Sequence, residues 1–109
     1  MAGKVIFKRG EAKHLTLSVS QDGSAVDLSG ATLFLGVKKS KTDSGFVLSK
    51  TDGEFNKSQA GDGVVSVFLS ESDLDQEAGL YVAELKVEFP DGTIDKSLDL
   101  ALVIEPAVT

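Results

Sequence analysis

The stretch YVAELKVEFPDGTIDKSLDLALVI, from Tyr81 to Ile104, decides the fold class. Apolar residues take alternate positions from Tyr81 to Phe89 and again from Leu98 to Ile104. A period of two is typical of a strand that buries one face. Pro90-Asp91-Gly92 separates the two runs, and Asp-Gly favours tight turns because glycine adopts a positive φ without cost. The stretch therefore predicts an antiparallel hairpin with one face on a core.

The same period of two extends outward to the rest of the chain. Seven strands are predicted, over residues 4–8, 13–20, 31–39, 46–51, 64–69, 80–89 and 93–104. Their inward positions give the expected core: Leu15, Leu17, Val19, Leu33, Leu35, Val37, Val67, Leu85, Val87, Leu98, Leu100 and Leu102. Short strands with turn signals at this spacing indicate an all-β, immunoglobulin-like antiparallel β-sandwich, with residues 1–109 as a single domain.

Three segments between the strands carry weaker signals. Residues 70–78 are the one helical candidate, with Ser70 or Ser72 as a cap for a single turn. Residues 40–45 and 52–63 are polar and are interpreted as loops. Tyr81 is either a tyrosine corner, whose hydroxyl bonds back to the preceding loop, or a plain core aromatic at a strand start.

The composition excludes several classes of function. The 109 residues carry a formal net charge of −6, which disfavours nucleic acid and anionic membranes as partners. There is no cysteine and one histidine, so thiolate metal sites and cysteine nucleophiles are excluded. Charges interrupt the first nine residues, and the longest apolar run is residues 100–104, so neither a signal peptide nor a membrane span is expected.

Neither metal chemistry nor catalysis is expected. Asp73, Asp75 and Glu77 alternate like calcium ligands, but the sixth position of such a loop requires glycine and here holds Ala78. His14 falls on the polar phase of its strand without a triad or metal partner. Acidic pairs on the wet strand faces lack a concave apolar setting. We therefore expect a protein that is not an enzyme and has no cofactor.

Apolar residues on supposedly wet faces are more informative. In the immunoglobulin order the third, sixth and seventh strands share a sheet, so Phe34, Val82 and Val103 would lie on one outer face. A clustered exposed apolar patch indicates a surface for a protein partner. The alternative is that these residues are scattered, or are covered by the loops at residues 40–45 or 52–63.

A second patch and a charged rim follow from the same phase. Phe68 and Val64 would face outward on the opposite sheet and provide the second surface that a head-to-tail ring requires. Lys38, in phase with Phe34, and Glu84, beside Val82, would form a rim that sets register more than affinity.

One set of segments is informative through its order and spacing: Leu15–Val19, Asp22-Gly23, Val26–Thr32, Val37–Lys39, Ala60–Val65, Leu69–Asp73, Gly79–Tyr81, Glu84-Leu85 and Asp91–Ile94. With these segments the sequence, from about Glu11 to Thr109, resembles small bacteriophage tail proteins, above all the N-terminal domain of phage baseplate upper proteins.

The resemblance implies an immunoglobulin-like sandwich with a structural role in a phage or prophage tail, made in the host cytoplasm and carried in the virion. It implies other tail proteins as partners, with a homo-oligomer as a further possibility, and no catalytic residues. Baseplate upper proteins continue into long C-terminal regions that this sequence lacks, which leaves open a stand-alone component or a prophage remnant. The alternative function is a glycan-binding or adhesive sandwich, which the scarcity of exposed aromatic residues disfavours.

Overall fold

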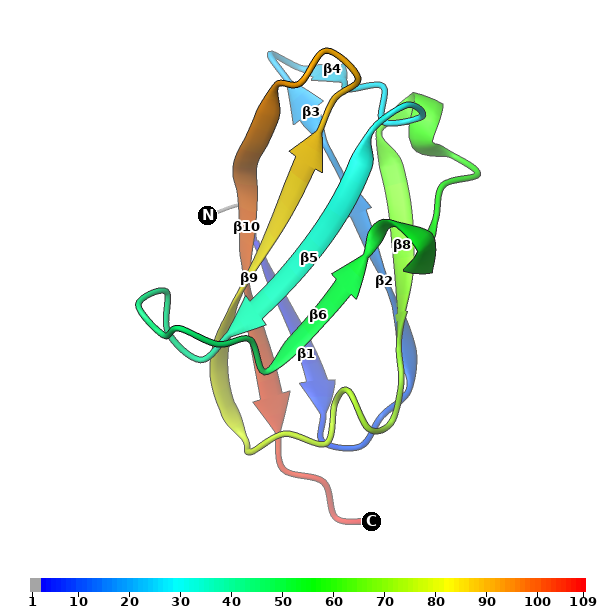
Figure 1. Cartoon of the computed structure of the whole chain (residues 1–109). Helices are drawn as coiled ribbons and strands as arrows, with labels where there is room; N and C mark the ends of the chain where they lie inside the picture. Colours follow the sequence, from blue (N-terminus) through cyan, green and yellow to red (C-terminus); the bar gives the residue numbers. More distant parts are fainter. Residues whose placement is uncertain (1–2) are drawn as a thin grey trace.

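Two β-sheets pack face to face in the computed structural model, which describes residues 3–109 apart from the side chain of residue 97 (Figure 1). The five-stranded sheet has the order β1-β10-β9-β5-β6, and the three-stranded sheet has the order β2-β8-β7. A two-stranded ribbon, β3-β4, extends beyond them. The strands are β1 (Lys4–Lys8), β2 (Lys13–Ser18), β3 (Ser20–Gln21), β4 (Ser24–Ala25), β5 (Thr32–Lys38), β6 (Leu48–Thr51), β7 (Phe55–Asn56), β8 (Val64–Leu69), β9 (Gly79–Glu88) and β10 (Ile94–Glu105).

The predicted all-β sandwich is confirmed, and each of the seven predicted strands has its counterpart. The sheet that carries β5, β9 and β10 is the one expected from the immunoglobulin order. One pairing departs from the antiparallel prediction, because β1 runs parallel to β10 with Ile6 opposite Val103. The predicted strand over residues 13–20 is broken after Ser18, where the chain turns into the β3-β4 ribbon.

The segment 52–63, predicted to be a loop, is more ordered than expected. It forms β7 on the edge of the three-stranded sheet and two short 3-10 turns, η1 (Asp52–Glu54) and η2 (Ala60–Asp62). Asp52 accepts the backbone N–H of Leu33 at 3.0 Å and pairs with Lys57 at 3.1 Å. The bond from Leu33 is the main cause of the lowered pKa of Asp52. The bond from Leu33 fixes the segment to β5, and the sequence pattern missed it because its two residues are 19 positions apart.

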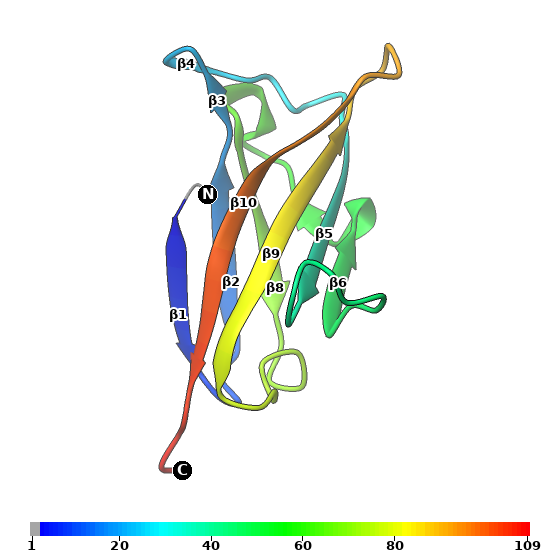
Figure 2. The same ribbon diagram turned by 90° about the vertical axis from the view of Figure 1, so that its left-hand side faces the viewer.

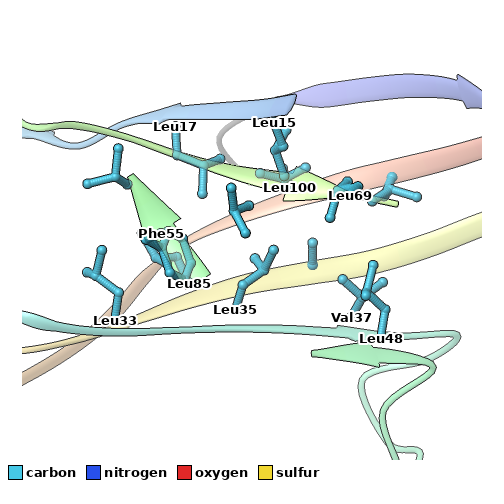
Figure 3. Close-up of a cluster of buried hydrophobic side chains, with 14 of the residues drawn as sticks. Leu15, Leu17, Leu33, Leu35, Val37, Leu48, Phe55, Leu69, Leu85 and Leu100 are labelled. Carbon is cyan, nitrogen blue, oxygen red and sulfur yellow. The ribbon is translucent and has the colours of Figure 1, made fainter. Parts of the chain in front are cut away.

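The core lies between the two sheets, and Figure 3 shows its side chains pointing inward from both. Ten of the twelve predicted core residues are buried. Val19 and Leu98 are only partly buried. Val19 follows the end of β2, and Leu98 follows the register shift that begins at Asp95, so both lie where a strand departs from regular pairing. The alternation therefore identified the core well except at these irregularities.

Residues 70–78 do not form a helix. Leu74 donates its backbone N–H to Ser70 at 3.1 Å, which closes a single turn. Ser70 and Asp73 cap each other, since each backbone N–H donates to the other side chain. Leu74 is fully buried under this turn, so the segment closes one end of the core. No helix within residues 3–109 is long and apolar enough to cross a membrane.

Tyr81 is a tyrosine corner, the first of the two interpretations of this residue. Its ring is buried, and its hydroxyl donates to the backbone oxygen of Glu77 at 2.5 Å.

We expect Tyr81→Phe to lower the free energy of unfolding by about 1–2 kcal/mol, because a carbonyl oxygen loses its donor while the packing stays. Urea unfolding of both proteins measures the difference. An unchanged midpoint would show that the bond contributes nothing.

Candidate functional site

The outer face of the five-stranded sheet is the candidate site. Strand alternation turns the even-numbered residues of β5 and β9 outward, away from the core. Register places Phe34 beside Lys86, and Lys38 beside Val82. The outward residues at the centre of this face are Phe34, Gly36, Lys38, Val82, Glu84 and Lys86. Apolar and cationic side chains are thus interleaved on two paired strands.

The loop over residues 39–47 lies against this face and protrudes to the left in Figure 1. It brings Phe46 onto Phe34, with ring centroids 5.5 Å apart and nearly edge-to-face. Gly36 lies under the same ring, because a Cβ there would come within 2.5 Å of a Phe46 ring carbon. The sequence predicted an exposed Phe34, but it is half-buried because Phe46 covers part of it. The alternative interpretation, that a loop covers the predicted patch, is therefore partly correct, because the 39–47 loop covers part of Phe34.

The sheet and the loop together line a hollow of about 360 Å³ that is open to solvent. Its lining residues are Phe34, Gly36, Lys38, Lys41, Phe46, Val82, Glu84, Lys86 and Lys96. Lys38 and Glu84, the two residues predicted to form a charged rim, both belong to it. The Nζ atom of Lys38 lies 5.1 Å from the centre of the Phe46 ring, and that of Lys86 lies 5.8 Å from the centre of the Phe34 ring. The hollow thus has an aromatic floor under ammonium groups.

Two exposed ion pairs tie the loop to its neighbours. Lys41 donates to Asp99 of β10 at 2.8 Å, and Lys39 donates to Glu77 at 3.0 Å. The first bond lowers the pKa of the Asp99 carboxyl and raises the pKa of Lys41. Because such pairs contribute at most about 1 kcal/mol each, they position the loop more than they stabilise the fold.

An apolar strip continues from the hollow toward the N-terminal strand. Leu80 lies two residues before Val82 on the outward phase of β9. It is opposite Val103 of β10, which in turn is opposite Ile6 of β1. Leu80 is 60% exposed and Ile6 is 50% exposed. Phe34, Val82 and Val103 therefore share one outer face, although Val103 belongs to the strip and does not line the hollow.

The predicted second patch is not formed. Phe68 and Val64 both lie on β8 but are four residues apart, or about 13 Å along a strand, with Ser66 between them. Phe68 is 46% exposed and packs beside His14, with ring centroids 5.1 Å apart. Val64 lines a separate shallow hollow with polar neighbours. Both residues face outward as predicted, but they are too far apart to form one continuous apolar patch, and their contact with a partner stays a prediction.

Sequence reasoning missed several contributors to the site: Ile6, Lys41, Phe46, Leu80, Lys86 and Lys96. The sequence placed Phe46 at the start of the predicted strand over residues 46–51, but β6 begins at Leu48 and Phe46 belongs to the preceding loop. Gly36 was the available clue, since an isolated glycine inside a strand often marks a close approach by another group. Across the residues that the structure describes, no group of three or more His, Asp or Glu side chains could hold a metal ion.

No protein-family model matches this sequence, and no curated protein sequence matches it. Solved structures do share its fold. The N-terminal domain of phage TP901-1 ORF48 is 12% identical with a TM-score of 0.60, over 96% of this chain and 85% of that one. CopC from Methylosinus trichosporium OB3b is 15% identical with a TM-score of 0.57, over 97% of this chain and 87% of that one. At these identities the similarity concerns the fold alone, and one of these folds comes from a phage protein.

Proposed function

We propose that this chain is a non-enzymatic structural module of a phage or prophage tail or baseplate particle, which acts through protein–protein contacts. The observation that carries the proposal is the outer face of the five-stranded sheet. There Ile6, Val103, Leu80 and Val82 form a continuous apolar strip next to the Phe34–Phe46 hollow. A soluble domain rarely leaves such a strip on a sheet face unless a partner covers it.

The fold supports the same proposal, since it is shared with an N-terminal domain of a phage protein. The chain would then reside in the virion, with other particle proteins as its partners.

A glycan-binding role is less well supported. The tyrosine is buried, and Phe34 and Phe46 meet nearly edge-to-face, so the two rings of the hollow do not present one flat stacking platform.

The test is incorporation into particles produced with Phe34→Asp or Leu80→Asp in place of the wild-type chain. We expect each variant to enter particles at least about 10-fold less, because a buried carboxylate in an apolar contact costs well over 1.4 kcal/mol. Quantitative mass spectrometry of purified particles measures the loss. Leu80 is the safer position, since it is more than half exposed and its replacement should not affect folding.

Val108→Asp is the matched control, because Val108 is fully exposed in the C-terminal tail and lies away from the sheet face. It should enter particles as the wild type does. Normal incorporation of a folded Leu80→Asp chain, or absence of the wild-type chain from particles, would contradict the proposal.

A further inference from the structure

Positive charge is concentrated in the hollow of a chain that is acidic as a whole. Four of the 11 basic residues, Lys38, Lys41, Lys86 and Lys96, line it together with a single carboxylate, Glu84. Among the described residues, Lys41 is the one lysine of the four that is ion-paired to a carboxylate. Because the floor beneath them is aromatic, the hollow suits a partner segment that is both acidic and partly apolar.

The turn between β9 and β10 has this complementary character. Asp91 lies in the turn itself, between Glu88 at the end of β9 and Asp95 near the start of β10, and no Lys or Arg occurs between Val87 and Asp95. Pro90 is exposed beside them, and Ile94 is 54% exposed. Figure 2 shows the turn projecting from the upper right corner of the molecule, beyond the ends of the sheets.

Hydrogen bonds within the turn hold its shape, which lowers the entropy cost of docking. The backbone N–H of Phe89 donates to Thr93 at 2.9 Å, and that of Gly92 donates to Phe89 at 2.9 Å. Asp91 accepts both the N–H and the hydroxyl of Thr93, at 2.9 and 2.7 Å. The hydroxyl bond is the main cause of the lowered pKa of Asp91, so its charge persists in mildly acidic solution.

We propose that the β9–β10 turn of one copy docks into the lysine-lined hollow of a second copy. This inference rests on the proposed contact function and names the partner as another copy of this chain. Since the turn and the hollow are different surfaces, the contact is head-to-tail and leads to rings or open chains. A contact made by one turn buries less area than a standard interface, and it depends on charge, so the free protein associates weakly and in a salt-sensitive way. Repetition of the contact around a particle strengthens the assembly.

The experiment is sedimentation equilibrium of the full chain up to about 1 mM at low and high salt, a range suited to weak contacts. The hollow variant is Lys86→Glu with Lys96→Glu. The turn variant is Glu88→Gln with Asp91→Asn, because asparagine still accepts the Thr93 bonds. We expect the wild type to associate, and each variant alone to associate at least about 10-fold more weakly, as loss of 1.4 kcal/mol or more requires.

The decisive arm is an equimolar mixture of the two variants. The hollow variant keeps an intact turn and the turn variant keeps an intact hollow, so the mixture should form one-to-one pairs that do not grow further. The charge control is Lys8→Glu with Lys13→Glu. It changes the net charge by the same amount as the hollow variant, but at exposed residues outside the hollow. This control should associate more strongly than the hollow variant.

Three results would overturn the inference: a monomeric wild type at 1 mM and low salt, a hollow variant that behaves like its charge control, or a mixture that does not pair. Thermal melts of each variant separate loss of the contact from loss of the fold. A monomeric wild-type chain that still enters particles would overturn self-docking and leave the proposed particle role standing. Failure of Leu80→Asp to reduce incorporation would contradict that role independently of this experiment.

Discussion

Leu35→Ala should lower the free energy of unfolding by about 2–5 kcal/mol, the range for removing a large aliphatic side chain from a packed core. Leu35 is fully buried at the centre of β5, where its inward phase places it opposite Leu85 of β9. Figure 3 shows it pointing into the core between the two sheets. Replacement by alanine removes apolar contact and leaves a cavity that two paired strands cannot close. Chemical denaturation monitored by circular dichroism measures the change.

Phe34→Ala is the matched control, since it changes the next residue on the same strand. Phe34 faces outward and is covered only in part by Phe46, so its removal leaves an open surface and no internal cavity. We expect a cost clearly below that of Leu35→Ala, about 1 kcal/mol, most of it from the lost aromatic contact. Equal losses at the two positions would mean that the inward and outward phases of β5 are wrong.

The strand phases could be predicted because they depend on local information. A period of two in β5, β9 and β10 reports which side of each strand is buried, and the Asp-Gly turns report where strands end. The predicted turn at Asp91-Gly92 is confirmed, since Gly92 has a positive φ between β9 and β10. Asp22-Gly23 turns the chain in a similar way between β3 and β4, where both residues have a positive φ.

The parts that could not be predicted depend on contacts between distant residues. The packing of Phe46 on Gly36 requires knowledge of where the connection over residues 39–47 folds, which the alternation within each strand does not report. The parallel pairing of β1 with β10 joins opposite ends of the sequence. The same holds for the hollow, because its lysines come from β5, β9, β10 and the 39–47 loop. Alternation predicted that Lys86 faces outward, but not that it has lysine neighbours.

The second large effect on stability is expected from a substitution at Gly63. Gly63 has φ +76°, and a Cβ there would lie 2.6 Å from the backbone oxygen of Val19 and 2.9 Å from that of Val26. Its own carbonyl accepts the N–H of Val19 at 2.8 Å, and the N–H of Val26 donates to Val19 at 3.0 Å. Three chain segments therefore meet backbone to backbone at this glycine, where β8 begins beside the end of β2.

Gly63→Ala should lower the free energy of unfolding by about 2–5 kcal/mol. About 1–2 kcal/mol arises from the left-handed backbone, and about 1–3 kcal/mol from overpacking against atoms that cannot rotate away. Gly23→Ala separates these causes, because Gly23 has φ +81° but a Cβ added there would meet no heavy atom within 4 Å. It should show the conformational cost alone. If urea unfolding gives the two variants equal losses, the close backbone approach at Gly63 does not exist, and the junction between β2, β4 and β8 is looser than its hydrogen bonds indicate.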